Sequence, residues 1–141
     1  MKELDLSHNL LRSVPHLLVN CQALKILTLS HNLISEFSIA FIKLPTLEYL
    51  YLAFNEVTIL PDDPAWKGCN LKVLDLESNS IYEVPSVILR DSKIHNLNLK
   101  DNHIERKQLQ MIEGFGEYEE RRKIKMDVVV NNHLDANFGN M

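Results

Sequence analysis

A short segment recurs five times along the chain at an almost constant interval. Each copy begins with a leucine, a variable residue and a second leucine, and an asparagine follows five residues after the first leucine. Successive copies are 23, 23, 24 and 23 residues apart, which is typical of stacked structural repeats. The first leucines are Leu4, Leu27, Leu50, Leu74 and Leu97, and the asparagines are Asn9, Asn32, Asn55, Asn79 and Asn102.

The repeated segment resembles the leucine-rich-repeat superfamily. Residues 24–34 and 47–57 match the family's pattern L-x-x-L-x-L-x-x-N-x-L almost letter for letter, and the resemblance covers roughly residues 2–104. It implies an α/β solenoid of horseshoe shape, with a parallel concave β-sheet and an irregular or short-helical convex side. The motif is specific for the fold and not for the function, because repeat scaffolds of this kind carry many unrelated binding tasks.

The residue pattern gives a physical reason for this fold. Alternation of leucines with variable residues predicts a short strand in each copy, with the leucines directed inward and the variable residues outward, and successive strands stack as a parallel sheet. Each asparagine falls where the chain turns inward, so we expect a ladder of side-chain amides that bond backbone groups left unpaired by the turns. Replacing one of these asparagines by alanine should cost about 1 to 3 kcal/mol.

The return path between the strands also repeats. The dipeptides Val14-Pro15, Leu60-Pro61 and Val84-Pro85 occupy matching phases, where proline fixes an extended turn, whereas Phe37-Ser38 departs from them. Apolar residues that follow these turns predict short helical or irregular pieces packed behind the sheet. They include Leu18, Phe41, Trp66 and Ile88.

The pattern divides the chain into three parts. Residues 1–104 hold the five repeats, residues 105–126 form a helical C-terminal cap broken near Gly114 and Gly116, and residues 127–141 form an extended or mobile tail. The cap is expected because a solenoid needs a terminal element that covers its last repeat.

The first predicted strand starts within four residues of Met1, so no capping element precedes it. The sheet edge and the leucines of the first repeat would then be open to pairing or aggregation. This arrangement favours three alternatives: a fragment of a longer repeat array, a truncated isoform, or a protein that covers the edge by self-association.

Composition argues against several classes of partner. With 15 Lys and Arg against 19 Asp and Glu, the net charge of -4 gives no electrostatic basis for binding nucleic acid or an acidic membrane surface. No apolar run approaches the roughly 18 residues of a membrane helix, and residues 1–10 are too short and polar for a signal peptide. Only Cys21 and Cys69 occur, and we interpret both as buried thiols. Without a disulfide framework, a soluble protein of the cytoplasm or nucleus is predicted.

Residues that could perform catalysis follow no recognised pattern. The sequence has no Gly-x-Ser-x-Gly elbow and, with only four glycines, no glycine-rich phosphate loop. The best case for a metal is His8 with His31 beside Asp5, because imidazoles and carboxylates are zinc ligands. Ser-His-Asn is a common filling of the variable positions in this repeat, so we predict no metal site, no cofactor and no enzymatic activity.

The outward residues of the five strands define the predicted binding surface. Neighbouring strands lie about 4.8 Å apart, so residues at equivalent positions are adjacent. The middle copy contributes Tyr49, Tyr51 and Phe54, and aromatic anchors with acidic surroundings are typical of protein interfaces. The candidate partner-binding residues are Asp5, Ile26, Thr28, His31, Tyr49, Tyr51, Phe54, Val73, Asp75, Glu77 and Asn98.

We therefore predict an intracellular protein–protein interaction module that binds a partner protein on its concave face through this aromatic patch. A rigid, preformed wall loses little entropy on binding, so a few anchors can suffice. The alternative is a structural or assembly element that self-associates or pairs through its uncapped N-terminal repeat edge.

Overall fold

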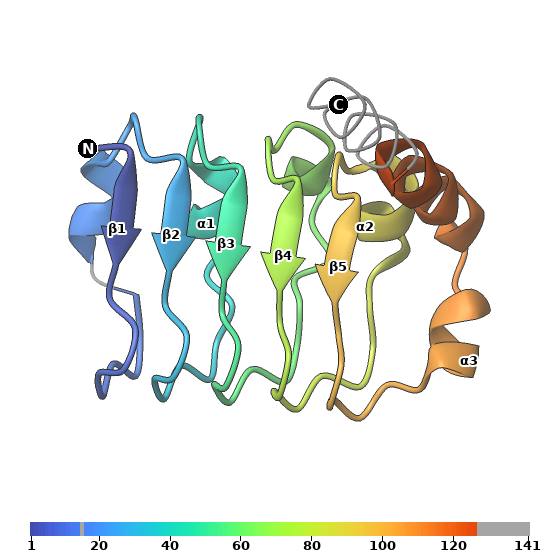
Figure 1. The fold of residues 1–141 in the computed structure, drawn as a ribbon, viewed down its shortest axis with the longest axis horizontal. Coiled ribbons are helices and arrows are strands. Elements are labelled where there is room, and N and C mark those ends of the chain that lie inside the picture. Colours follow the sequence, from blue (N-terminus) through green and yellow to red (C-terminus); the bar gives the residue numbers. More distant parts are fainter. Residues whose placement is uncertain (15, 127–141) are drawn as a thin grey trace, which may run out of the picture.

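Five short strands form one layer of the molecule. The computed structural model describes residues 1–14 and 16–126. The strands are parallel and lie side by side in the order of the sequence (Figure 1). Each has a leucine at its centre, and their bounds are Glu3–Asp5 (β1), Ile26–Thr28 (β2), Tyr49–Tyr51 (β3), Val73–Asp75 (β4) and Asn96–Asn98 (β5).

The register of the sheet confirms the predicted columns of equivalent positions. Leu27 of β2 pairs with Leu4 on one side and Leu50 on the other, and the same one-to-one pairing continues through β4 and β5. Because successive side chains of a strand alternate between the two faces, the central leucines share one face of the sheet. The first and third residues of every strand share the opposite face, the concave face.

Short helices cover the face of the sheet that carries the leucines (Figure 1). They confirm the predicted convex side of short helical pieces. In the third of them, the Asp63 carboxylate accepts a hydrogen bond from the Ala65 N–H at 2.8 Å, and the Trp66 indole N–H donates to the Pro61 carbonyl at 2.8 Å. The bounds of these helices are His16–Asn20 (η1), Ala40–Lys43 (α1), Pro64–Lys67 (η2) and Ser86–Asp91 (α2), where η marks a 3-10 helix.

The hydrophobic core fills the space between the sheet and the convex helices. The central leucines Leu27, Leu50 and Leu74 are 0% exposed, because each has a neighbouring repeat on both sides. Trp66 and Phe41 close the core from the convex side and are fully buried as well. The core is therefore continuous along the repeats, as expected for a solenoid.

The predicted ladder of asparagine amides is present. Asn79 accepts a hydrogen bond from the Val57 N–H at 3.0 Å through its Oδ1 atom. Its Nδ2 group donates to the carbonyls of Leu52 at 2.9 Å and Leu76 at 3.0 Å, so the amide joins two repeats. The residue before each asparagine has a left-handed backbone, with φ between 54° and 58°. These residues are His8, His31, Phe54, Ser78 and Asp101.

Two helices follow the last strand: Arg106–Gln110 (α3) and residues 115–126. The chain turns between them, with Gly114 at a φ of +98°. A Cβ atom on Gly114 would lie 2.5 Å from the backbone nitrogen of Arg90, so only glycine fits this close approach. Gly116 lies inside the second helix and causes no break, which differs from the expectation.

Two side chains of the second helix form hydrogen bonds with the backbone of the last repeat. The Tyr118 hydroxyl accepts a hydrogen bond from the Leu97 N–H at 2.9 Å, and the Arg121 guanidinium donates to the Ile94 carbonyl at 2.9 Å. The Tyr118 hydroxyl thus accepts, at Leu97, the hydrogen bond that a further strand would accept. The predicted C-terminal tail, residues 127–141, lies outside the described residues.

Candidate functional site

Tyr49 and Tyr51 lie at the centre of the concave face. Both belong to β3, the middle strand of the sheet, and both side chains are half-buried. They are therefore open to contact with another molecule without a rearrangement of the sheet. The register sets their neighbours in the adjacent strands, which are Ile26 and Val73 for Tyr49, and Thr28 and Asp75 for Tyr51.

A hollow of about 410 Å³ opens on the concave face beside Tyr51. Its volume is within the range of about 300 to 1,000 Å³ that is usual for ligand pockets. Four of the predicted contact residues line it together with Tyr118 and Arg122 of the C-terminal helix. The four are Tyr51, Val73, Asp75 and Asn98.

The carboxylate of Asp75 is held in one orientation within this hollow. Its Oδ1 atom accepts hydrogen bonds from the Glu77 N–H at 3.1 Å and from the Asn98 side-chain amide at 3.0 Å. Both bonds use the same oxygen of the carboxylate. The fixed group therefore presents negative charge next to the aromatic ring of Tyr51, in the arrangement that a basic side chain of a partner requires.

Arg122 lines the hollow, and the sequence analysis did not predict it. Its guanidinium makes two hydrogen bonds to the Glu119 carboxylate, at 2.9 and 3.1 Å. These bonds from Arg122 are the main reason that the pKa of Glu119 is lowered. The sequence signal for Arg122 is a run of charges between residues 117 and 125, which is more often a solvated helix face.

Phe54 lies outside the strand, in the turn that follows β3. Its ring stacks on the His31 ring with centroids 4.4 Å apart, and the His31 ring stacks on that of His8 at 4.3 Å. The three rings are nearly parallel because their residues share the same left-handed backbone in successive repeats. Phe54 is 46% exposed, so the ring ladder adds an aromatic strip to the border of the concave face.

The ring stacking argues against a zinc ion shared by His8 and His31. The nitrogen lone pairs of an imidazole lie in the ring plane, so two parallel stacked rings direct them side by side and not toward one point. The Asp5 carboxylate accepts hydrogen bonds from the Ser7 hydroxyl and N–H, which lower the pKa of Asp5. Within residues 1–14 and 16–126, no group of three or more His, Cys, Asp or Glu is placed to hold a metal.

The acidic residues of the predicted surface are divided between its two ends. Asp5 lies in β1, two strands away from Tyr51, whereas Asp75 and Glu77 lie in the neighbouring repeat on the other side. The structure therefore brings Asp75 beside Tyr51 and Glu77 beside Phe54, but leaves Asp5 at the N-terminal border of the sheet. The hollow beside Tyr51 is lined by residues from the C-terminal half of the predicted site.

The two cysteines differ in burial. Cys69 is buried, as predicted, and this burial raises the pKa of its thiol, which disfavours the nucleophilic thiolate. The prediction that Cys21 is also buried is wrong, because this residue is half-buried. Cys21 follows η1 in the first repeat, where a neighbouring repeat covers it on one side only.

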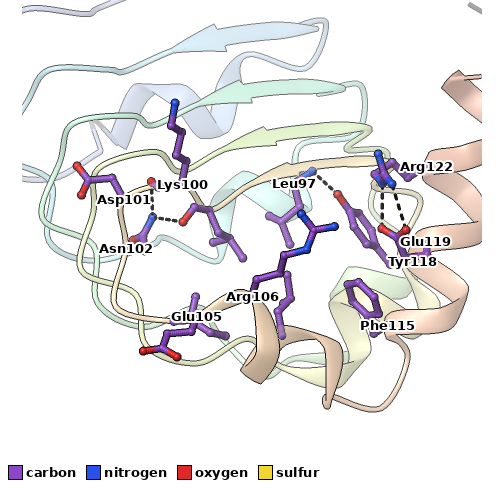
Figure 2. A pocket seen from close by; sticks show the side chains of 13 residues that line it. Leu97, Lys100, Asp101, Asn102, Glu105, Arg106, Phe115, Tyr118, Glu119 and Arg122 are labelled. Carbon is purple, nitrogen blue, oxygen red and sulfur yellow. Dashed lines mark hydrogen bonds and ion pairs between the residues drawn. The ribbon is translucent and has the colours of Figure 1, made fainter.

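A second hollow lies at the free edge of β5, and the sequence analysis missed it. It measures about 530 Å³ and separates the last repeat from the C-terminal helices (Figure 2). Leu99 and Ile104 of the repeat line it on one side, and Leu109 and Phe115 of the helices line it on the other. A cap was predicted over residues 105–126, but it leaves part of the last repeat uncovered.

Together, the fold and these surfaces define a repeat solenoid with an uncovered sheet face. Two family models, both described as leucine-rich repeat, match residues 1–57 and 70–91, which is more than half of the chain. The chain belongs to the leucine-rich-repeat superfamily. Proteins of this superfamily are in general protein-interaction modules and typically not enzymes.

Solved structures from two bacteria are similar to this chain. A leucine-rich-repeat protein of Leptospira interrogans is 25% identical with a TM-score of 0.71, over 84% of this chain and 29% of that protein. An internalin (inlF) of Listeria monocytogenes is 26% identical with a TM-score of 0.55, over 69% of this chain and 27% of the internalin. The chain thus spans less than a third of the length of either protein. None of the described helices is long and apolar enough to cross a membrane.

Proposed function

We propose that the protein binds a partner protein on its concave face and performs no catalysis itself. The observation that carries this proposal is the hollow beside Tyr51, which is lined by Val73, Asp75 and Asn98 of the predicted surface. An aromatic and apolar centre with a polar border matches the usual anatomy of protein interfaces. The rest of the predicted surface, from Thr28 to the N-terminal side, would form the border of the interface.

Tyr51 is the expected anchor of this interface. Its half-buried ring combines a large contact area with little freedom to lose on binding, and central aromatic residues often dominate binding energies. The Asp75 carboxylate and the nearby Glu77 side chain would pair with a basic side chain of the partner. The partner surface should therefore combine an apolar residue with an arginine or lysine.

The aromatic ladder of His31 and Phe54 extends this surface along one border. Phe54 is 46% exposed, and the equivalent position of the next repeat holds the small Ser78, so a planar group of the partner can stack on the ring. Such contacts need no conformational change of the solenoid, so binding by rigid presentation is expected. We place this interaction in the cytoplasm or nucleus, in accordance with the low cysteine content of the sequence.

A pair of tyrosine variants tests the proposal. Tyr51→Ala removes the anchor, whereas Tyr82→Ala removes a tyrosine that is 52% exposed but lines a different part of the surface. Wild type and both variants are used to capture partners from a cell lysate, after circular dichroism shows equal folding. A partner retained by wild type and Tyr82→Ala should bind Tyr51→Ala at least about 30-fold more weakly, as for a hot-spot residue.

The result would contradict the proposal if both variants capture the same proteins with the same affinity as wild type. Combining Tyr51→Ala with Tyr49→Ala and Phe54→Ala then serves as the stricter test. If this triple variant also binds every partner normally, the concave face is not the binding surface.

Assembly through the N-terminal edge is the second candidate function. Leu4, Leu6 and Leu11 are only half-buried in the first repeat, and Leu10 of the same repeat is 81% exposed. An edge of this kind can pair with a second copy of the chain. Sedimentation at high concentration should then show an oligomer that Leu10→Glu dissociates. A wild-type chain that remains monomeric would contradict self-association.

A further inference from the structure

The segment that directly follows β5 carries two backbone N–H groups that have no acceptor among the described residues. In each earlier repeat, the N–H that follows the strand donates to the next repeat, as Leu76 does to the Asn98 carbonyl at 2.9 Å. The N–H two residues further donates to the next repeat as well. The equivalent groups in the last repeat belong to Leu99 and Asp101, and both residues line the hollow of Figure 2.

The C-terminal helices replace the missing neighbour only at the start of this edge. The Tyr118 hydroxyl accepts the hydrogen bond from the Leu97 N–H, and both residues also line the hollow of about 530 Å³. Leu99 and Ile104 remain half-buried there. Two N–H groups without acceptors lie next to leucine and isoleucine side chains that are only half-buried. These features are typical of a sheet edge that can accept another strand.

The charged side chains that line this hollow set a third requirement for its ligand. The Glu119 carboxylate is paired with Arg122, and the Asp101 carboxylate accepts a hydrogen bond from the Ser78 hydroxyl at 2.7 Å. Arg106 of α3, by contrast, has no ion pair or side-chain hydrogen bond among the described residues. Figure 2 shows its guanidinium group directed into the hollow. A ligand that fits the hollow should therefore bring hydrogen-bond acceptors, apolar groups and one negative charge.

We propose that this edge binds an extended peptide segment of a partner protein as a sixth strand of the sheet. In the first repeat, the equivalent N–H groups of Leu6 and His8 donate to the alternate carbonyls of Thr28 and Ser30 in the next repeat. The N–H groups of Leu99 and Asp101 can therefore bond alternate carbonyls of an added segment. An apolar side chain of the peptide enters the hollow between Ile104 and Phe115. An acidic side chain of the peptide pairs with Arg106.

This site is additional to the proposed concave surface. The two hollows share Leu97, Tyr118 and Arg122 in their walls, but Tyr51 lines only the concave one. Strand addition at β5 therefore does not depend on the tyrosine anchor. Binding at the edge should persist in Tyr51→Ala, so failure of one proposal leaves the other intact.

The test uses the full chain and a defined probe peptide. The probe is a hexapeptide of alternating threonine and valine with blocked ends and aspartate as its last residue. At saturation, amide hydrogen exchange measured by NMR should slow at least tenfold at Leu99 and Asp101. Arg106→Gln should raise the dissociation constant about tenfold, because one charge-assisted hydrogen bond is lost.

Lys107→Gln is the matched control. Lys107 is the next residue of α3, is exposed and does not line the hollow, so this variant should bind the probe like wild type. A probe with asparagine in place of aspartate should bind wild type and Arg106→Gln equally. Equal effects of the two substitutions on the aspartate probe would show that general charge attraction, and not the hollow, holds the peptide.

Three other results would overturn the proposal. Absence of saturable binding at millimolar probe concentration excludes strand addition of this kind. Protection of the Leu99 and Asp101 amides in the free chain would show that residues 127–141 or a second copy already occupy the edge. If octanoate binds with the same dependence on Arg106 but without protecting these amides, the hollow is a site for fatty acyl carboxylates and not for a peptide.

Discussion

The two ends of the solenoid carry the same repeat motif but are covered differently. In the first repeat, Leu4 is half-buried and Asn9 is exposed. In the last repeat, Leu97 is 9% exposed and lies under Tyr118, which is itself 5% exposed. The comparison shows that a motif position does not determine burial by itself. The neighbour that stacks on the repeat determines how much of its apolar surface is removed from water.

The cover at the C-terminal end is also incomplete. Tyr118 and Arg121 bond to the backbone of the last repeat at Leu97 and Ile94, but Leu99 remains half-buried beside the second hollow. In a solenoid each repeat is stabilised mainly by its direct neighbours, so both ends should open more easily than the middle. The C-terminal end should nevertheless be the more stable of the two, because two helices pack on it.

The largest expected effect is a difference in unfolding free energy between variants of the central leucines in the two terminal strands. Leu97→Ala should cost about 2 to 4 kcal/mol of unfolding free energy, since it leaves a cavity under Tyr118. Leu4→Ala should cost about half as much, because water already reaches the half-buried side chain. Urea unfolding of both variants measures the difference. Equal losses would show that the C-terminal helices do not keep water away from β5.

A smaller difference in unfolding free energy is expected between variants of the asparagines in the same two repeats. The Asn102 amide accepts a hydrogen bond from the Ile81 N–H at 2.9 Å and donates to the Leu76 carbonyl at 2.8 Å, so it ties the last repeat to the one before. Asn9 bonds only carbonyls of its own repeat and is exposed. Asn102→Ala should therefore cost about 1 to 3 kcal/mol, and Asn9→Ala less than about 1 kcal/mol.

The same urea measurement, with leucine variants as reference, checks this prediction. A loss for Asn9→Ala as large as that for Asn102→Ala would mean that the amide acts within its own turn and not between repeats. The expected difference instead follows from the unpaired backbone groups that Asn102→Ala leaves in the adjacent repeat.

The sequence was sufficient to predict the sheet, its register and the asparagine ladder. Each of these follows from a strict period: Leu27 must align with Leu50, and Asn79 must reach the turn of the preceding repeat, if equal units stack. The same period predicted that Tyr49 and Tyr51 lie together on the concave face of β3. Periodicity converts local residue identity directly into neighbours in space, so these predictions needed no other information.

Features that depend on the end of the array could not be predicted in this way. The period stops after the fifth repeat, so it did not show that Arg122 would line the concave hollow together with Asp75. It also gave no measure of how closely the helix beginning at residue 115 approaches β5, and the hollow beside Leu99 depends on that distance. The predicted burial of Cys21 was wrong for a similar reason. The repeat pattern does not show that Cys21, in the first repeat, has a neighbouring repeat on one side only.

The smallest expected effect is a loss of stability at low pH, which should begin at the C-terminal end of the solenoid. Burial lowers the pKa of His95, which precedes β5, and the positive charges of Lys125 and Lys72 lower it further. The unfolded chain binds a proton at this side chain near pH 6.5, while the folded chain binds it only at lower pH. Between the two values the unfolded state holds more protons, so stability should fall as the pH drops below about 6.5.

His95→Gln should remove this part of the pH dependence. Urea midpoints at pH 7.5 and 5.5 should therefore differ more for wild type than for the variant, by a modest amount because the half-buried imidazole is screened by solvent. Since Lys125 and Arg121 belong to the covering helix, a protonated His95 repels that helix in particular. Amide exchange in residues 115–126 should then accelerate at pH 5.5 before exchange in β2 or β3 does. Uniform acceleration along the chain would show that acid acts on the whole solenoid and not on its covered end.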